Sequence, residues 1–278
     1  MSAPRPRVLV LLGMLLGFLL GAAGCGVSPD EEVALGREGA AEINAQLPLV
    51  TDPVVVQYVT SLGRDIASRT SRGDLEWQFQ IVNSPEVNAF ALPGGFIYVN
   101  RGLIERAERL DELAGVLGHE IGHVVRRHSA EQLENQQRAN AGLALVCTLT
   151  SVCESGAARV AINVGGAALF ARHSRLDESQ ADSEAVENVI RAGYDPDGIP
   201  AMFERLVAER RGRPTVLDAF FASHPLEESR VARTRALVAA YDPAHLEGLV
   251  QDTPEFHAFQ SRLSALPPGV PPAAPATR

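Results

Sequence analysis

The stretch DELAGVLGHEIGHV, residues 111–124, decides the fold and the chemistry of this 278-residue chain. Its apolar residues recur three or four positions apart, which predicts a long helix capped by Asp111. Within this helix His119 and His123 lie four positions apart, so both imidazoles lie on one face and can bind one metal ion. Glu120, beside the first histidine, is then placed to act as general base toward a metal-activated water.

A catalytic zinc site needs a third protein ligand and an open fourth position. A third histidine at the extended metzincin spacing is excluded, because Arg126 and Ser129 stand where that motif has glycine and histidine. His128 is predicted to lie about half a helical circumference away from His119, so it does not converge on the same ion.

A downstream pair of acids offers the missing ligand. Glu178 and Asp182 are four positions apart in a polar stretch, residues 176–192, that is predicted to be helical, so they share a face. One carboxylate can bind the metal while the other accepts a hydrogen bond from the far nitrogen of a ligand histidine. The sequence alone does not say which acid has which part.

The rest of the chain combines several helices with a small number of strands. Strand patterns cover residues 75–82, 87–92 and 96–99, and Pro93, Gly94 and Gly95 predict a hairpin between the last two. Helical patterns cover residues 30–47, 53–68, 102–107, 200–210 and 226–240. We therefore predict an α+β fold, mainly helical, with a small sheet beside the helix of His119 and His123.

Two segments have unusual compositions. Residues 139–170 are rich in Ala, Gly and Val, which is compatible with a buried helix pair, a mobile lid or a hairpin that touches a membrane. Residues 266–278 are rich in proline, which predicts an extended, disordered tail.

The N-terminus has the pattern of a secretory signal. Arg5 and Arg7 precede an apolar run, residues 8–23, which is shorter than a spanning helix requires, and small residues follow it. An uncleaved membrane anchor is the alternative interpretation. The segment that ends at Cys25 resembles the lipobox of bacterial lipoproteins, although Ala22 stands where leucine is usual. The resemblance implies a signal peptide over residues 1–24 and acylation of Cys25.

Lipidation of Cys25 would anchor the chain stably, because two or three acyl chains hold far better than one. Gly26 after the cysteine implies sorting to the outer membrane, with the domain on its periplasmic face. Cys147 and Cys153 then remain as an even pair, either bonded in an oxidising periplasm or free. Residues 25–29 would be anchor and linker, and residues 30–265 one catalytic domain.

The charge balance excludes one class of partner. The formal net charge is −9, with 34 acidic and 25 basic residues. A nucleic-acid-binding protein needs a basic face to neutralise phosphates. We therefore expect that this chain does not bind nucleic acid.

Taken in order, these motifs resemble the gluzincin metallopeptidases of the HtpX and Oma type. The resemblance rests on the His119–His123 motif, the Glu178–Asp182 pair, Arg126-Arg127-His128 and two further segments. These segments are Asn88 to Gly95, which resembles the strand pair before the active helix, and Ser223-His224-Pro225 with Arg230. It covers roughly residues 30–245 and is closest to members of the family without membrane spans.

The resemblance implies a role for each matching residue. One zinc ion per chain would be held by His119, His123 and Glu178, with Glu120 as base and Asp182 beside a ligand histidine. His224 would stabilise the oxyanion or occupy the fourth metal position at rest, unless it is an ordinary turn histidine.

Two further assignments follow from the same resemblance. Arg230 would act through the carboxylates or on the oxyanion, unless it is an ordinary surface arginine. Gly94, Gly95, Phe96 and Ile97 would form an edge strand to which an extended substrate adds.

The expected function is therefore a zinc endopeptidase of the bacterial cell envelope that degrades misfolded or stalled envelope proteins. The alternative is a chaperone-like outer-membrane assembly factor whose capped zinc site rarely cleaves. A purely structural zinc site is disfavoured, because such sites are usually closed by four ligands and rich in cysteine. The oligomeric state is not predicted.

Overall fold

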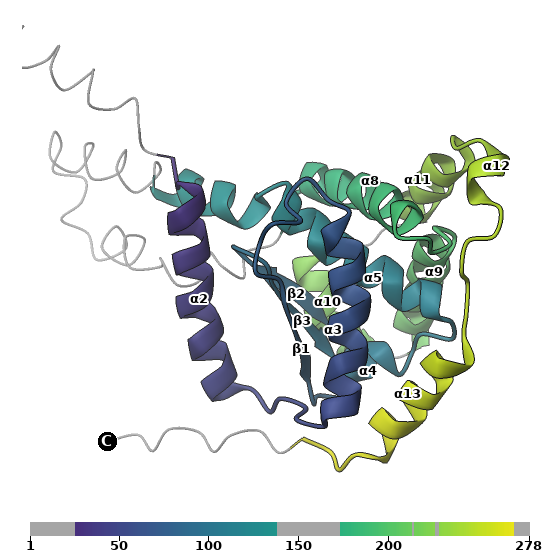
Figure 1. Ribbon diagram of the computed structural model, residues 1–278, viewed down its shortest axis with the longest axis horizontal. Helices are drawn as coiled ribbons and strands as arrows, with labels where there is room; N and C mark the ends of the chain where they lie inside the picture. Colours follow the sequence, from purple (N-terminus) through teal and green to yellow (C-terminus); the bar gives the residue numbers. More distant parts are fainter. Residues whose placement is uncertain (1–25, 138–172, 213, 226–227, 270–278) are drawn as a thin grey trace, which may run out of the picture.

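The computed structural model describes residues 26–137, 173–212, 214–225 and 228–269 (Figure 1). The strands are β1 (Gln78–Val82), β2 (Ala89–Leu92) and β3 (Phe96–Asn100). The helices up to the metal-binding motif are α2 (Pro29–Gln46), α3 (Pro53–Ser68), α4 (Arg101–Ile104) and α5 (Leu110–Val125). Those after it are α8 (Arg175–Arg191), α9 (Gly198–Gly212), α10 (Pro214–Ser223), α11 (Glu228–Ala239), α12 (Pro243–Leu246) and α13 (Pro254–Ala265).

The sheet is small and mixed, with the strand order β1-β3-β2. β2 and β3 are antiparallel, as the hairpin pattern predicts, and the turn between them contains Gly94 at φ 79° and Gly95 at φ 98°. Glycine suits these positions because residues with a Cβ rarely adopt positive φ. β1 runs parallel to β3 and pairs with its other edge.

The predicted substrate strand is therefore wrong in one respect. β3 is the central strand, so both of its edges are already hydrogen-bonded to neighbouring strands. The Phe96 and Ile97 backbone belongs to these ladders, and Gly94 and Gly95 form the turn, so an extended peptide cannot add along this segment. The sequence pattern identified the strand but not its place in the sheet, which depends on the parallel pairing with the distant β1.

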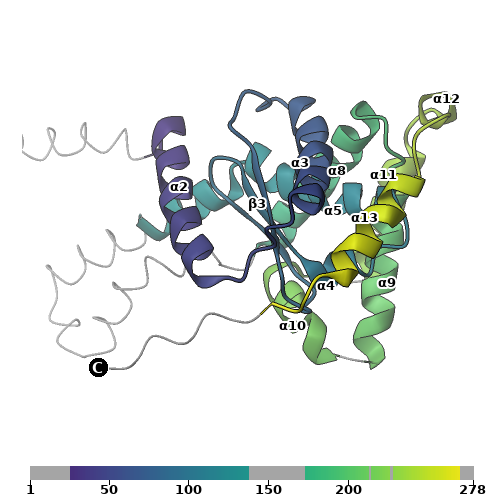
Figure 2. The same ribbon diagram turned by 60° about the horizontal axis from the view of Figure 1, so that its bottom comes forward.

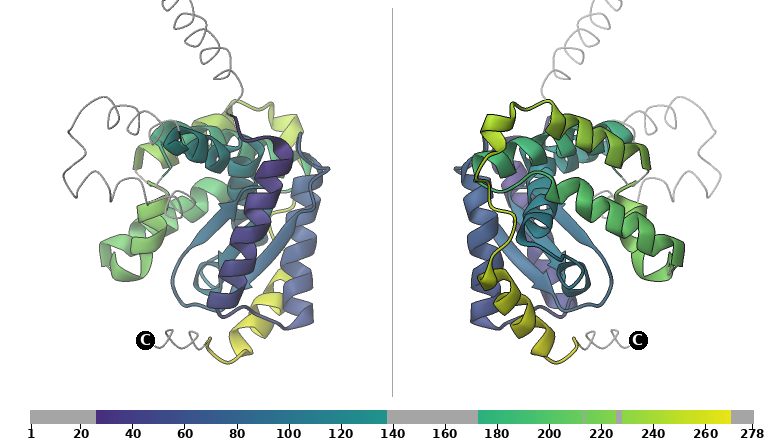
Figure 3. Two further views of the ribbon diagram at one scale, coloured as in Figure 1. Left: turned by 90° about the vertical axis from the view of Figure 1, so that its left-hand side faces the viewer. Right: turned by 90° about the vertical axis from the view of Figure 1, so that its right-hand side faces the viewer.

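The sheet lies between two helical layers (Figures 2 and 3). α2 covers one face, where Ala40 and Ile43 pack against Phe96 and Tyr98. α3 and α5 cover the other face, and their apolar residues join alternate strand residues such as Ile97 in the main core. The alternation follows from the two-residue period of a strand. The predicted α+β class is confirmed, and α3 has the predicted bounds.

Several local features differ from the sequence-based predictions. Arg109 is the N-cap of α5, and Asp111 instead lies in the first turn, where it pairs with the Arg109 side chain at 2.9 Å. α10 and α13 were not predicted. α13 carries a recognisable start signal, because Thr253 caps it and Pro254 follows.

The beginning of the predicted tail is bound to the domain. Arg101 donates a hydrogen bond to the carbonyl oxygen of Leu266 at 2.9 Å, and Asn83 donates one to that of Pro267 at 2.9 Å. The predicted signal peptide, Cys25, Cys147, Cys153 and the whole of segment 139–170 lie outside the described residues. Across the part of the chain that the structure describes, every helix falls short of the length or apolarity needed to cross a bilayer.

Candidate metal centre

α5 supplies the first two candidate metal ligands from a fully buried position. Every residue from Leu110 to Val124 is buried, so the histidine face of this helix points into protein rather than into solvent. The Nε2 atoms of His119 and His123 lie 3.0 Å apart, as expected for imidazoles one turn apart on the same face.

α8 packs along α5 because two glycines allow a close approach. A Cβ at Gly118 would lie 2.9 Å from the Val189 side chain, and one at Gly122 would lie 2.9 Å from the Ala181 carbonyl oxygen. Both distances are too short for a real Cβ, so a larger residue at either position would push α8 away. This packing brings the acids of α8 over the histidines.

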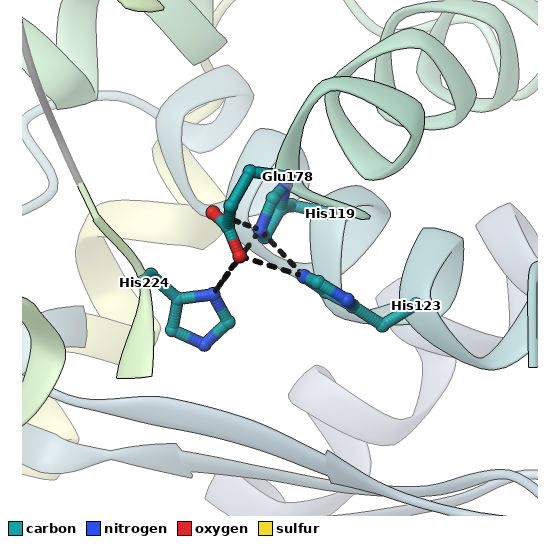
Figure 4. Close-up of side chains that lie close together, drawn as sticks. All are labelled: His119, His123, Glu178 and His224. Atoms are coloured by element: carbon teal, nitrogen blue, oxygen red, sulfur yellow. Dashed lines mark hydrogen bonds and ion pairs between the residues drawn. The ribbon is translucent and has the colours of Figure 1, made fainter. Parts of the chain in front are cut away.

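Glu178 lies in the first turn of α8, which begins at the capping box of Ser174 and Asp177. Its Oε1 atom is 3.4 Å from His123 Nε2, and its Oε2 atom is 3.5 Å from His119 Nε2. His224, which follows α10, points to the same place, with its Nδ1 atom 3.0 Å from Glu178 Oε1 and 3.4 Å from His119 Nε2 (Figure 4).

The four side chains His119, His123, Glu178 and His224 fit a divalent metal ion. Their ligand atoms lie within 4.8 Å of one another, and all four residues are buried. Bonds of about 2.0–2.1 Å in tetrahedral geometry place ligand atoms about 3.3 Å apart, which matches the separations given above. Nitrogen and carboxylate oxygen are the donor atoms that zinc accepts in catalytic sites.

Glu120 has the environment of a proton acceptor. Both of its carboxylate oxygens are buried without a hydrogen-bond partner in the described residues. Burial raises the pKa of its carboxyl group, against the nearby charges of His224 and His119. His224 Nε2 is 3.6 Å from Glu120 Oε1. A raised pKa makes this carboxylate a stronger base than an exposed glutamate.

The pKa values of Glu178 and His123 are lowered, whereas that of Glu120 is raised, and lowered values suit metal ligands. Burial alone would raise the pKa of Glu178, but the charge of His224 and hydrogen bonds from His119 and His123 hold it far below its usual range. Burial keeps the pKa of His123 well below its ordinary value. The carboxylate is therefore ionised and the imidazole neutral, the protonation states that metal binding requires.

Asp182 contacts the His119 nitrogen that faces away from Glu178, and Arg230 in turn binds Asp182. Asp182 Oδ1 is 3.1 Å from His119 Nδ1, and Arg230 donates to both Asp182 oxygens, at 2.7 and 2.8 Å. Arg230 also pairs with Glu178 and is only 2% exposed. Of the two functional roles considered for Arg230, the geometry thus favours action through the carboxylates.

The carboxylates of Asp182 and Glu178 also act on His119 itself. Burial and the charge of Arg230 disfavour a proton on this imidazole, but the two acids outweigh them and raise its pKa to about 9. Binding of a metal at Nε2 would therefore release a proton from the site.

Two further histidines lie beside His123. His128 is outside the group that contains His119, as predicted, whereas sequence reasoning did not consider His173. His128 Nδ1 lies 2.9 Å from His123 Nδ1, because α5 ends at Val125 and a turn at residues 126–127 separates it from the next helical segment, residues 128–137. The ring of His173 lies 3.9 Å from that of His123 between centroids. Burial and neighbouring histidines such as His224 lower the pKa of His173 to about 3, so its ring is neutral. No local pattern marks His173, since it is brought here by tertiary packing.

Comparison with known proteins supports a hydrolytic site. The family model described as peptidase family M48 matches residues 54–238, a range that contains every residue of the four-residue group. The chain is 30% identical over 250 residues to the β-barrel assembly-enhancing protease of Escherichia coli O157:H7, which covers 87% of this chain and 50% of the relative.

Two further relatives agree with this assignment. The β-barrel assembly-enhancing protease of Yersinia pestis is 32% identical over 226 residues, covering 77% of this chain and 46% of the relative. Mitochondrial metalloendopeptidase OMA1 of Schizosaccharomyces pombe is 30% identical over 176 residues, covering 63% of this chain and 51% of the relative. The chain spans about half the length of these curated relatives. By its sequence match and its buried His/Glu group, the chain belongs to peptidase family M48.

Proposed function

We propose that this chain is a zinc-dependent endopeptidase of the bacterial cell envelope, anchored by a lipid at the periplasmic face of the outer membrane. The observation that carries the catalytic part is the convergence of His119, His123 and Glu178 in one buried group, with Glu120 beside it. The names of the relatives, proteases and metalloendopeptidases, support the same chemistry.

The chemistry that zinc would supply here is Lewis acidity, which lowers the pKa of water and polarises a peptide carbonyl. His119, His123 and Glu178 would hold the ion, and Asp182 orients His119 by accepting a hydrogen bond from its Nδ1–H. Glu120 takes the proton of the attacking water on its carboxylate and then delivers it to the leaving amine. Arg230 keeps Asp182 and Glu178 ionised through its charge.

His224 favours a resting state in which the fourth metal position is occupied by protein. The distance of 3.0 Å between its Nδ1 atom and Glu178 Oε1 is similar to the separation of two ligand atoms on one metal ion. Its Nε2 atom faces Glu120. In this arrangement His224 must move before a substrate carbonyl can enter. The same observation favours the second candidate function, a chaperone-like assembly factor whose capped site rarely cleaves.

The proposed substrates are unfolded or misassembled envelope proteins. The names of the relatives include β-barrel assembly, which supports this class. An extended chain is bound through main-chain hydrogen bonds, which require little sequence specificity. Since β3 is internal, the strand we propose for substrate addition is β2, which is an outer strand of the sheet and packs against α5.

Metal removal tests the catalytic proposal. Wild-type protein is expected to contain about one zinc ion per chain and to cleave casein, because His119, His123 and Glu178 leave a position for water once His224 has moved away. Dialysis against a chelator should abolish cleavage, and stoichiometric zinc should restore it. Casein digestion and metal analysis measure both quantities. Undiminished cleavage by the metal-free protein would exclude the proposed mechanism.

Lipid attachment is tested at Cys25. Cells that express the full chain with labelled palmitate should incorporate label into the wild type and not into Cys25→Ser, because only the thiol is acylated. The variant should then leave the outer-membrane fraction for the soluble periplasm. Equal labelling of the two proteins, or an unchanged distribution, would refute the proposed anchor.

A further inference from the structure

We propose that His128 and Gln180 set the tautomer and the orientation of His123. This inference rests on the proposed role of His123 as a metal ligand, and it makes His128 a positioning residue rather than a ligand. The sequence-based argument assigned His128 no role near the metal.

The three side chains form a continuous hydrogen-bonded chain that ends at the metal-binding group. The Nε2 atom of His123 faces that group, 3.4 Å from Glu178 Oε1. Its Nδ1 atom lies 2.9 Å from His128 Nδ1, and His128 Nε2 lies 2.9 Å from Gln180 Oε1. His128 is 1% exposed, so solvent does not compete for these contacts.

The proton positions follow from these contacts one after another. A metal bound at His123 Nε2 needs the lone pair of that atom, so the ring proton must lie on Nδ1. The Nδ1–H then donates to His128 Nδ1, which must carry no proton. His128 therefore has its own proton on Nε2, where the side-chain oxygen of Gln180 accepts it. One amide oxygen thus selects, through His128, the tautomer of His123 that can bind the metal.

The hydrogen-bonded series from His123 to Gln180 resembles the series of contacts made by His119. His119 has its Nδ1 atom on Asp182, a charged partner, whereas His123 has a neutral imidazole in the equivalent place. A partner beyond the ligands fixes the orientation of a metal-binding histidine and increases its basicity. Each ligand histidine of α5 is therefore supported from behind by a residue of α8, directly for His119 and through His128 for His123.

A strained turn brings His128 to this position. Arg127 has a φ of 60°, which is uncommon for a residue with a side chain, and it lies in the turn that interrupts the helix between Val125 and His128. The turn is held by Glu32 of α2, whose Oε2 atom accepts a hydrogen bond from Arg127 Nε at 2.7 Å. Arg72 donates to the other oxygen of Glu32 at 2.7 Å, and Glu32 is 1% exposed. Strain of this kind persists only where surrounding contacts hold it.

The same histidines suggest a second metal site, but their contacts argue against one. His123, His128 and His173 have ligand atoms within 4.8 Å of one another. However, His128 Nε2 is already bonded to Gln180, and His173 Nδ1 lies 3.1 Å from Gln132 Nε2. One nitrogen of His128 and one of His173 are therefore satisfied by amides, and the Nδ1 atoms of His123 and His128 face each other, as expected for hydrogen-bonded imidazoles.

Two substitutions of similar shape test the proposal. In His128→Asn the side-chain oxygen can take the place of Nδ1 and still accept the proton of His123, whereas His128→Leu offers no acceptor. We expect the leucine variant to bind zinc about 10- to 100-fold more weakly than wild type. The asparagine variant should stay close to wild type. Competition with a chromophoric chelator measures the affinity, and His257→Leu, at an exposed histidine paired with Asp252, is the control.

Nitrogen NMR of the metal-free wild-type protein gives a test that needs no variant. It should show His128 with its proton on Nε2 and His123 with its proton on Nδ1. The opposite tautomer of His128, equal zinc affinity in the asparagine and leucine variants, or a second zinc ion lost with His128 would each overturn the inference. If wild type binds zinc at His119 and His123 while the two variants behave alike, only this inference fails and the proposed function stands.

Discussion

Replacement of Glu120 with glutamine is expected to reduce cleavage of an unfolded protein at least about 100-fold, the lower end of the contribution of a general base. The amide is nearly the same size as the carboxylate but cannot accept the proton of the attacking water. Zinc content should stay near that of wild type, because Glu120 is outside the group of ligands. Initial rates of casein digestion at saturating zinc measure the effect.

The matched control is Glu131→Gln, the same change at an exposed position on the helical segment 128–137. It should leave the rate unaltered.

Complementation of an envelope-stress phenotype separates the two candidate functions. If Glu120→Gln complements as well as wild type, cleavage is dispensable and the chaperone-like function is favoured. If it fails while the control complements, the protease function is supported.

Replacement of Arg230 with methionine is expected to lower the free energy of unfolding by about 3–5 kcal/mol, the range for breaking a buried ion pair. Arg230 is 2% exposed and Asp182 is completely buried, so the substitution leaves a buried carboxylate without its cationic partner. Burial alone would raise the pKa of Asp182, but the charge of Arg230 and the contact with His119 outweigh it and hold this pKa below its ordinary value. Denaturant unfolding of the metal-free protein measures the loss.

The control for this prediction lies on the same helix. Arg235 pairs with Glu204 at 2.7 Å, but its side chain is 58% exposed. Arg235→Met should therefore cost about 1 kcal/mol or less, as exposed ion pairs do. The burial of Arg230 already excludes the alternative of an ordinary surface arginine. Equal losses in the two variants would show that its buried ion pair contributes no more to stability than an exposed one. A weaker zinc affinity in Arg230→Met alone would support its action through Asp182 and Glu178.

The helix of the metal-binding motif could be predicted because the interactions that define it are local. The spacing of His119 and His123 places them on one face in any α-helix, and their apolar neighbours favour burial of that helix. Local spacing was not enough to predict the role of the two acids of α8, because an acidic pair on a polar helix is usually exposed to solvent. Only the packing at Gly118 and Gly122 shows that Glu178 lies over the histidines.

The errors occurred where contacts distant in sequence decide the conformation. The position of β3 depends on its pairing with β1, and the strand pattern of residues 96–99 is the same at the centre of a sheet as at its edge. His128 was placed by extending a helix that in fact ends at Val125. The turn that follows is held by Glu32, 95 residues before Arg127, so no local rule predicts it.

The sequence by itself therefore determined the fold class, the family and the two histidines of α5 that can hold a metal, because helix periodicity and motif spacing act over a few residues. Only the tertiary structure decided which side chains contact these histidines on the nitrogen that faces away from the metal-binding group. Asp182, held by Arg230, contacts His119. His128, held by Gln180, contacts His123. The physical reason is that a hydrogen bond between buried side chains needs positions accurate to a few tenths of an ångström. That accuracy arises from the packing of whole helices against one another.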